Sequence, residues 1–290
     1  MDIQNLTAFI AVFEQQSFSK AAGHLNLTQP AVSKRIAALE QDYSTTLFNR
    51  IGKSIVLTEA GEILLPSARH IIEEIKRSHQ SIQGLNGELG GELKLATSHH
   101  IGLHRLPPVL RAFSSAYENV ELDLHFMDSE QACEMIENGE LELAIVTLPR
   151  KPSKNLVTEL IWHDPLVVVV GKTHALASKP NISTDDLIDR PAILPSHETF
   201  TRSMIEQQLS LKQLPPIALE TNYLETIKMM VSIGLGWGVL PKSMVHDELI
   251  EFEIEGVHMS RELGAVYHHN RTLSSASLEM LKVLETFKSV

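Results

Sequence analysis

Five residues that stand close together have the chemistry to bind DNA. The amide of Gln29 can pair with a base edge through both of its groups, and adenine is the usual match. Ser33 can reach a base or a phosphate, and Lys34 mainly supplies a phosphate contact. Thr28 can cap a helix while it donates to a phosphate, and Pro30 is tolerated in the first turn of that helix. These residue types and their spacing predict a base-reading surface at a helix N-terminus.

Three short helices are expected to position this surface. Apolar residues recur at helical spacing over 3–13 and 18–25, and a third helix is predicted over about 29–43. The third helix is expected to bury four apolar side chains, those of Val32, Ile36, Leu39 and Tyr43. Two short helices joined by a tight turn, with polar residues at the start of the second, are typical of a helix-turn-helix.

A short hairpin is predicted directly after these helices. Residues 46–50 and 54–57 have the composition of strands on either side of a turn. Such a hairpin would form a wing, and its tip carries the two cations Arg50 and Lys53. We expect both to contact phosphates or to enter the minor groove.

A long helix is predicted from Thr58, its N-cap, to about Leu85. Its apolar positions alternate spacings of three and four, as in a coiled coil: Leu65, Ala68, Ile72, Ile75, His79 and Ile82. Such a face must be buried, either against a second copy of the same helix or against the chain's own N-terminal domain. Pro66 predicts a bend, or a later start of the regular coil. Residues 86–91 have the composition of a hinge.

Strands alternate with helices beyond this hinge. The predicted elements are strand 92–96, helix 106–117, strand 120–126, helix 129–138 and strand 141–147. This alternation predicts a parallel sheet. The apolar segment 166–170 is predicted to be a strand buried on both faces that opens a second subdomain. The sequence leaves open whether the last helix, 277–287, returns to the first subdomain.

Motifs over roughly the first 65 residues resemble the signature of the LysR-type transcription regulators. They lie at 17–22 (SFSKAA), 27–33 (LTQPAVS), 39–40 (LE), 47–50 (LFNR) and 57–61 (LTEAG). The C-terminal part is similar over most of its length but less specifically. Its landmarks lie at 106–108 (LPP), 139–145 (GELELAI) and 234–241 (GLGWGVLP).

The resemblance implies a multidomain chain of mixed α+β and α/β class. It implies a winged helix-turn-helix at 1–58, a linker and dimerisation helix at 59–87, a hinge at 88–91 and an effector-binding domain at 92–290. That domain would have two α/β lobes like those of periplasmic binding proteins. Lobe I would comprise about 92–161 and 266–290, and lobe II about 162–265.

The resemblance also implies the partners. Family members bind double-stranded operator DNA in the cytoplasm, with RNA polymerase as a further partner, and activate or repress an operon. They dimerise through the long helix, here residues 59–87, and commonly form homotetramers. A small-molecule effector bound between the lobes would control this regulator, and we expect no metal and no other cofactor.

The loop after the first strand of the second domain is the first place to expect the effector, because ligands of parallel α/β units lie at the carboxyl ends of strands. This loop, two further strand ends and the opposite lobe supply the candidates: Thr97, Ser98, His99, His100, Asp128, Thr147, Thr199, Phe200 and Thr201. Ser98 matches a family position that often contacts the ligand, whereas His99 and His100 replace the proline and threonine common in relatives. An anionic effector is the family default, but no arginine clamp stands at the expected places.

Other functions remain as alternatives. A metal- or pH-responsive regulator would use His99, His100 and His104, because the last two are one helical turn apart, although no third ligand is evident. An enzyme is disfavoured, since the sequence has no phosphate loop, dinucleotide fingerprint, nucleophile elbow or His-Glu-x-x-His zinc pattern. The predicted wing and recognition helix argue against a solute-binding protein that does not contact DNA.

The charge distribution agrees with a DNA-binding N-terminal part. The net charge is −11, but residues 1–90 hold eight basic and nine acidic residues and so contribute only −1. A local basic patch is sufficient for phosphate contacts. The single cysteine, Cys133, excludes an intramolecular disulfide and fits a reducing compartment. No apolar run approaches the roughly 18–20 residues that a membrane span requires.

Overall fold

The chain divides into two compact units in the computed structural model, which describes residues 2–51, 54–84, 89–210 and 213–288. The N-terminal unit comprises residues 1–88 with 138–140, and the second unit comprises 89–137 and 141–290. The division follows the predicted hinge composition, although residues 85–88 themselves lie outside the described part.

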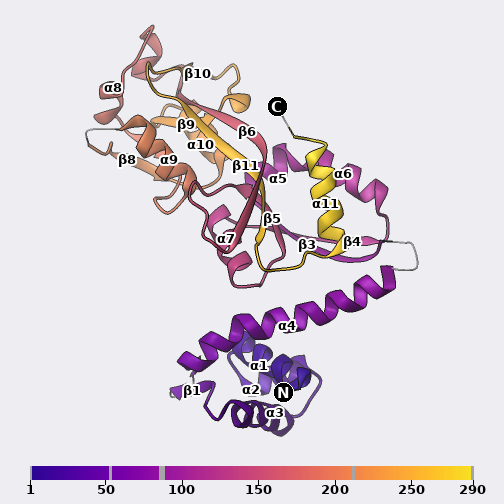
Figure 1. Cartoon of the computed structure of the whole chain (residues 1–290). Helices are drawn as coiled ribbons and strands as arrows, with labels where there is room; N and C mark the ends of the chain where they lie inside the picture. Colours follow the sequence, from indigo (N-terminus) through magenta and orange to yellow (C-terminus); the bar gives the residue numbers. More distant parts are fainter. Residues whose placement is uncertain (1, 52–53, 85–88, 211–212, 289–290) are drawn as a thin grey trace. The chain divides into compact units, whose positions relative to one another are not determined.

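Helices and one hairpin form the N-terminal unit (Figure 1). Its elements are α1 (Ile3–Gln15), α2 (Phe18–His24), α3 (Gln29–Tyr43), β1 (Phe48–Ile51), β2 (Ser54–Leu57) and α4 (Glu59–Gly84). Ser17 and Thr28 start α2 and α3 by accepting hydrogen bonds from the backbone N–H groups of Lys20 (3.3 Å) and Ala31 (3.4 Å). The predicted helix-turn-helix and the predicted cap at Thr28 are therefore confirmed.

One predicted core position of α3 is wrong. Val32, Ile36 and Leu39 are buried, but the side chain of Tyr43 is 45% exposed. Tyr43 is the last residue of α3, and Ser44, in the left-handed region with φ of 51°, ends the helix there. The aromatic ring therefore lies at the edge of the helical core rather than within it.

The long helix α4 begins where the sequence predicts. The hydroxyl of Thr58 accepts a hydrogen bond from the N–H of Gly61 at 3.1 Å, and the helix continues through Pro66. Gly61 allows the first turn to approach the preceding loop closely, since a Cβ at this position would lie 2.4 Å from the carbonyl oxygen of Leu47. A larger residue would therefore separate α4 from the hairpin.

The first part of the predicted coiled-coil face packs on the chain's own domain. Leu65 and Ala68 are buried in one hydrophobic cluster with the cores of α1 and α3, and Ile72 packs against it. The side chains of His79 and Ile82 lie outside the described residues. Of the two covers that the sequence left open, the chain's own domain therefore accounts for the beginning of α4.

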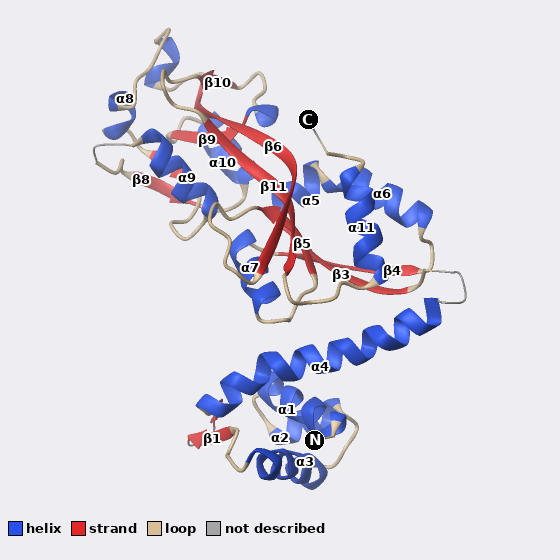
Figure 2. Ribbon diagram, viewed as in Figure 1, coloured by secondary structure: helices blue, strands red, loops and turns tan. Residues whose placement is uncertain are grey.

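A mixed sheet with helices on it forms the second unit (Figure 2). Its first elements are β3 (Gly91–Thr97), α5 (His99–His104), α6 (Leu106–Ala116), β4 (Val120–Phe126), α7 (Ser129–Glu137), β5 (Leu143–Thr147) and β6 (Leu156–Gly171). Then follow the 3-10 turn Ala175–Ser178, α8 (Asp185–Ile188), β7 (Ala192–Leu194), α9 (Phe200–Leu209), β8 (Ile217–Glu220), α10 (Leu224–Ser232) and β9 (Trp237–Pro241). The last elements are the 3-10 turn Lys242–Met244, β10 (Leu249–Phe252), β11 (Met259–His268) and α11 (Ser275–Glu285).

In the described residues the strands join in the order β4-β3-β5-β11-β6-β9-β7-β8, with β10 also paired to β6. The predicted parallel pairing is confirmed, because β3 runs parallel to both β4 and β5, as β7 does to β8 and β9. The apolar segment 166–170 is the second half of the much longer strand β6. All of β11 pairs antiparallel with residues 156–166 of β6, and the two strands connect the two ends of the sheet (Figure 2).

Separate hydrophobic cores lie at the two ends of β6 and β11. Trp162 and Leu263 pack with β3, β5 and α6, whereas Leu166 and Met259 pack with β7, β9 and α9. The last helix, α11, places Met280 in the first of these cores, which resolves the question that the sequence left open. We call the end with β3, β4 and β5 lobe I, and the end with β7, β8 and β9 lobe II.

Candidate DNA-binding and effector sites

The start of α3 carries the predicted DNA-reading residues on its surface. Thr28, Gln29, Pro30 and Lys34 are exposed and Ser33 is half-buried. The amide nitrogen of Gln29 donates to the hydroxyl of Ser33 at 3.0 Å, one turn further along the helix. The two base-reading candidates therefore lie on one face of α3, at its N-terminal end.

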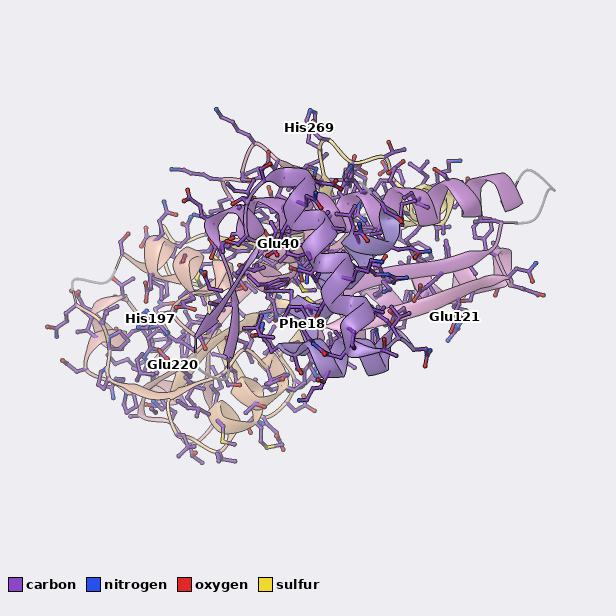
Figure 3. The ribbon with its side chains drawn as sticks, turned by 90° about the horizontal axis from the view of Figure 1, so that it is seen from below. Phe18, Glu40, Glu121, His197, Glu220 and His269 are labelled. Carbon is purple, nitrogen blue, oxygen red and sulfur yellow. The ribbon has the colours of Figure 1, made fainter. Side chains whose placement is uncertain are left out.

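The hairpin β1–β2 has the predicted form of a wing. Its strands pair antiparallel, with Phe48 opposite Leu57. Phe48 anchors the hairpin, because its ring centroid lies 5.2 Å from that of Phe9 and 6.1 Å from that of Phe18. Glu40 lies in α3 (Figure 3). Its carboxylate accepts a hydrogen bond from the N–H of Leu47 at 2.8 Å and so holds the chain before the wing.

The structure describes the cationic side chains of α3 but not those of the wing. The side chain of Arg50 and the whole of Lys53 lie outside the described residues. In α3, Arg35 donates to the side chain of Gln4 in α1 at 2.6 Å, which gives it a structural partner. The exposed side chain of Lys34 is therefore the cation of this face that the structure places.

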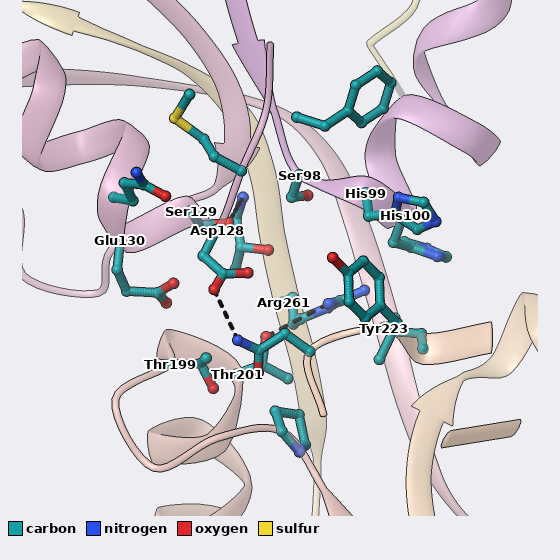
Figure 4. Close-up of a pocket in the computed structure, with 17 residues that line it drawn as sticks. Ser98, His99, His100, Asp128, Ser129, Glu130, Thr199, Thr201, Tyr223 and Arg261 are labelled. Carbon is teal, nitrogen blue, oxygen red and sulfur yellow. Dashed lines mark hydrogen bonds between the residues drawn. The ribbon is translucent and has the colours of Figure 1, made fainter. Parts of the chain in front are cut away.

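The second unit contains a cavity of about 300 Å³ where the two lobes meet (Figure 4). Most of the predicted effector residues line it: Ser98, His99, His100, Asp128, Thr147, Thr199 and Thr201. Phe200 is not among the lining residues, and its side chain packs against the hydrophobic cluster around Ile136 and Val146. Thr97 also does not line the cavity, because its hydroxyl is fully buried and donates to the carbonyl oxygen of Ile145 at 2.8 Å.

Helix starts from lobe I point toward this cavity. The segment after Thr97, treated as a loop in the sequence, forms the short helix α5 with Ser98 at its N-cap position. At the start of α7, the hydroxyl of Ser129 accepts a hydrogen bond from the N–H of Thr147 at 3.1 Å. This bond fixes the start of α7 against the end of β5, so that Asp128 and Glu130 stand at the rim of the cavity.

Lobe II contributes the opposite wall through two loops. Asn222 donates from its amide to the carboxylate of Asp128 at 2.9 Å, which joins the two lobes across the cavity (Figure 4). Thr199 caps α9 through the N–H of Arg202 at 3.1 Å. The fully buried guanidinium of Arg202 then donates to the carbonyl of Pro195 at 2.9 Å and to Glu206 at 2.6 Å. This network holds the start of α9, where Thr199 and Thr201 lie.

A buried arginine that the sequence analysis missed also lines the cavity. Arg261 of β11 is 7% exposed and donates to Oδ2 of Asp164, from Nε at 3.1 Å and from Nη2. Its Nη1 faces the hydroxyl of Thr201 at 3.5 Å (Figure 4). Oδ1 of Asp164 accepts a further bond from Arg105 at 3.4 Å. A lone arginine in a strand carries no sequence signal of this role, since its partner Asp164 stands on another strand.

Aromatic residues close one side of the cavity. The ring of His99 lies edge-on to that of Tyr223, with centroids 5.0 Å apart, and 6.1 Å from that of Phe126. Tyr223, at the start of α10, is a further lining residue that the sequence analysis did not identify. The side chain of His99 is therefore positioned by packing as well as by its place in α5.

Two titratable groups at the cavity are shifted by burial. Burial, together with the positive charge of Arg261, lowers the pKa of His100 to about 4. Its ring is therefore neutral near pH 7. Burial raises the pKa of Glu130 above its usual value, partly opposed by the hydrogen bond from the N–H of Phe200.

Both parts of the chain match known families. Residues 3–62 match the model of the bacterial regulatory helix-turn-helix protein, lysR family, and residues 86–288 match the LysR substrate binding domain. The chain belongs to the LysR family. The predicted family, the winged helix-turn-helix followed by a two-lobed α/β domain, and the interpretation as a transcriptional regulator rather than an enzyme are confirmed.

A relative and two solved structures illustrate this family membership. A probable RuBisCO transcriptional regulator of Thalassiosira pseudonana is 30% identical over 288 residues, which cover 94% of both chains. A full-length OxyR variant from Pseudomonas aeruginosa superposes with a TM-score of 0.74 at 21% identity, over 99% of this chain and 94% of that one. Full-length CbnR in complex with its target DNA gives a TM-score of 0.66 at 21% identity, over 99% and 100%. These two structures share the fold of the LysR-family chain.

Among the described residues of this LysR-family chain, no helix combines the length and the apolar character needed to span a bilayer.

Proposed function

We propose that this LysR-family regulator reads operator DNA with the N-terminal end of α3 and with the wing. The hydrogen bond between the exposed Gln29 and the half-buried Ser33 carries this proposal, because it presents an amide to base edges at a helix N-terminus. The full set of proposed contacts is Thr28, Gln29, Pro30, Ser33, Lys34, Arg50 and Lys53. The match of residues 3–62 to a DNA-binding family supports it.

We propose further that the regulator acts in the cytoplasm as a homodimer through residues 59–87, that two dimers form a homotetramer, and that RNA polymerase is a partner at the promoter. The alternating apolar spacing of α4 supports the dimer. Since Leu65 and Ala68 are covered by the chain's own domain, the partner helix would contact the part of α4 after them. The domain boundaries remain as proposed from the sequence, with the hinge at 88–91.

The effector is proposed to bind in the cavity between the lobes. Hydroxyl groups of Ser98 and Thr201 and the guanidinium of Arg261 offer donors to an acidic or acceptor group. The hydroxyl of Thr199 already donates to the carbonyl oxygen of Ser196 at 2.8 Å, so its proposed contact is through packing at the cavity wall. Asp128 and Glu130 face the same space and require donors. Because Asp164 already compensates Arg261, the cavity favours a small polar molecule with both an acidic or acceptor end and a donor end, rather than a simple anion.

DNA selection from sheared genomic fragments of the source organism tests the regulator function. Purified full-length protein is expected to enrich a small set of fragments that share one motif, and binding should weaken steeply as salt rises. A Gln29→Ala, Lys34→Ala double variant that keeps the wild-type circular dichroism spectrum should enrich none of them. Equal enrichment by the double variant would contradict the proposed DNA surface.

Two substitutions in the proposed effector cavity are expected to weaken effector binding. A panel of amino acids, hydroxy acids and simple carboxylates is screened for compounds that raise the melting temperature. Ser98→Ala and Thr201→Val are each expected to weaken the binding of a hit about 5- to 30-fold, since each removes one hydrogen bond of about 1–2 kcal/mol. Ser178→Ala, on the exposed 3-10 turn away from the cavity, is the control. A hit that binds both cavity variants as tightly as the wild type would place its site elsewhere.

A further inference from the structure

Three metal-ligating side chains from different lobes come together beside the effector cavity. His100 and His104 are one turn apart on α5, and Glu225 lies in the first turn of α10. One donor atom of each lies within 4.8 Å of the other two. Nε2 of His104 and Oε1 of Glu225 are 2.8 Å apart, and the two imidazole centroids are 4.8 Å apart.

Three buried polar atoms of this cluster have no hydrogen-bond partner among the described residues. His100 is only 6% exposed, and neither of its ring nitrogens has a hydrogen-bond partner among the described residues. Oε2 of Glu225 is also buried there without a partner. Buried polar atoms are normally hydrogen-bonded, so several orphaned atoms in one cluster indicate that a further group completes it.

We propose that His100, His104 and Glu225 bind a divalent transition-metal ion of the zinc type. Two imidazole nitrogens and one carboxylate oxygen, with a position left for water, form a common zinc ligand set. Tetrahedral zinc places such donor atoms about 3.3 Å apart. The side chains of His104 and Glu225, which are 46% and 37% exposed, can rotate by the small amount required. His104 and Glu225 also line a second pocket, through which an ion can reach the cluster.

The tertiary structure brings Glu225 to the two histidines as a third candidate ligand, whereas no third ligand is evident from the sequence. The histidine cluster in the sequence suggested His99, but the ring of His99 packs against Tyr223 instead. Glu225 is 121 positions from His104 along the chain. Because α5 belongs to lobe I and α10 to lobe II, a bound ion would join the lobes near the point where Asn222 already contacts Asp128.

Zinc titration of the full-length protein tests this proposal. The affinity tag is removed, the protein is treated with a chelator and dialysed, and ZnCl2 is added in competition with a zinc-binding dye. We expect one strongly bound zinc per chain, and a loss of affinity of at least about tenfold in both His104→Ala and Glu225→Gln. Each variant is first compared with the wild type by metal-free thermal unfolding, which establishes that it folds.

The control is a histidine–carboxylate pair of equal exposure elsewhere on the same unit. His125 lies 2.9 Å from Asp123, with side-chain exposures of 46% and 37%, the same values as for His104 and Glu225. His125→Ala should bind zinc like the wild type. Wild-type protein that binds zinc no better than His104→Ala, or an equal loss in His125→Ala, would overturn the site. The outcome is independent of DNA binding and therefore of the function proposed above.

Discussion

An Asp164→Asn variant is expected to melt roughly 6–20 °C below the wild type. The carboxylate of Asp164 is 1% exposed and is the anion that binds the buried guanidinium of Arg261. Asparagine keeps the shape but removes the charge, and it leaves Arg261 as an uncompensated buried cation. Breaking a buried pair in this way typically costs about 3–5 kcal/mol. Thermal unfolding followed by circular dichroism measures the effect.

Two comparison variants separate the buried charge from a general effect of removing a carboxylate. Glu253→Gln removes one of the two carboxylate partners of Lys242, at 2.8 Å in an exposed pair, and we expect no measurable change because surface pairs contribute little. Adding Arg261→Met to Asp164→Asn should restore most of the lost stability, since the unpaired charge is then gone. If Asp164→Asn melted within about 2 °C of the wild type, the loss of this carboxylate would not leave a costly unpaired charge, which would contradict the prediction.

A Gln29→Ala variant is expected to lose about 5- to 150-fold in affinity for a selected operator, because a bidentate base contact contributes about 1–3 kcal/mol of discrimination. Its affinity for unrelated DNA should change little. Fluorescence anisotropy with operator and scrambled duplexes at several salt concentrations provides both values. The ratio of the two affinities, rather than either alone, reports base reading.

Lys34→Ala should behave differently from Gln29→Ala. The loss of a phosphate contact weakens operator and scrambled DNA alike and reduces the salt dependence by about one charge. Gln41→Ala, at the exposed far end of the same helix, is the matched control and should bind like the wild type. A Gln29→Ala variant with unchanged discrimination would show that α3 reads DNA through other residues.

Local patterns predicted the N-terminal unit well. The bounds of α3, the cap at Thr28 and the pairing of β1 with β2 depend on contacts between residues near one another in the chain. Periodicity and capping residues report such contacts directly. The failure at Tyr43 has a tertiary cause. The same apolar spacing continues to the end of the helix, but the core on which it packs does not.

Local sequence patterns predicted only some elements of the effector-binding domain. The alternation of strands and helices predicted β3, β4 and β5 and their parallel pairing, because each βαβ unit is local. The extent of β6 was not predicted, since a strand that passes through two cores changes its burial pattern midway. The sequence predicts a loop where the six-residue helix α5 lies, because this helix is too short for helical periodicity to be recognised.

By itself the sequence determined the family and the order of the domains. It also predicted the end of α3 that we propose to read DNA and several residues that line the proposed effector cavity. Only the tertiary structure brought Arg261 to Asp164, 97 positions away, and Glu225 to His104. The first pair joins β6 to β11, and the second joins α5 to α10. In both pairs the two elements are far apart in the sequence. Their geometry follows from how separate elements pack, and no short stretch of residues encodes it.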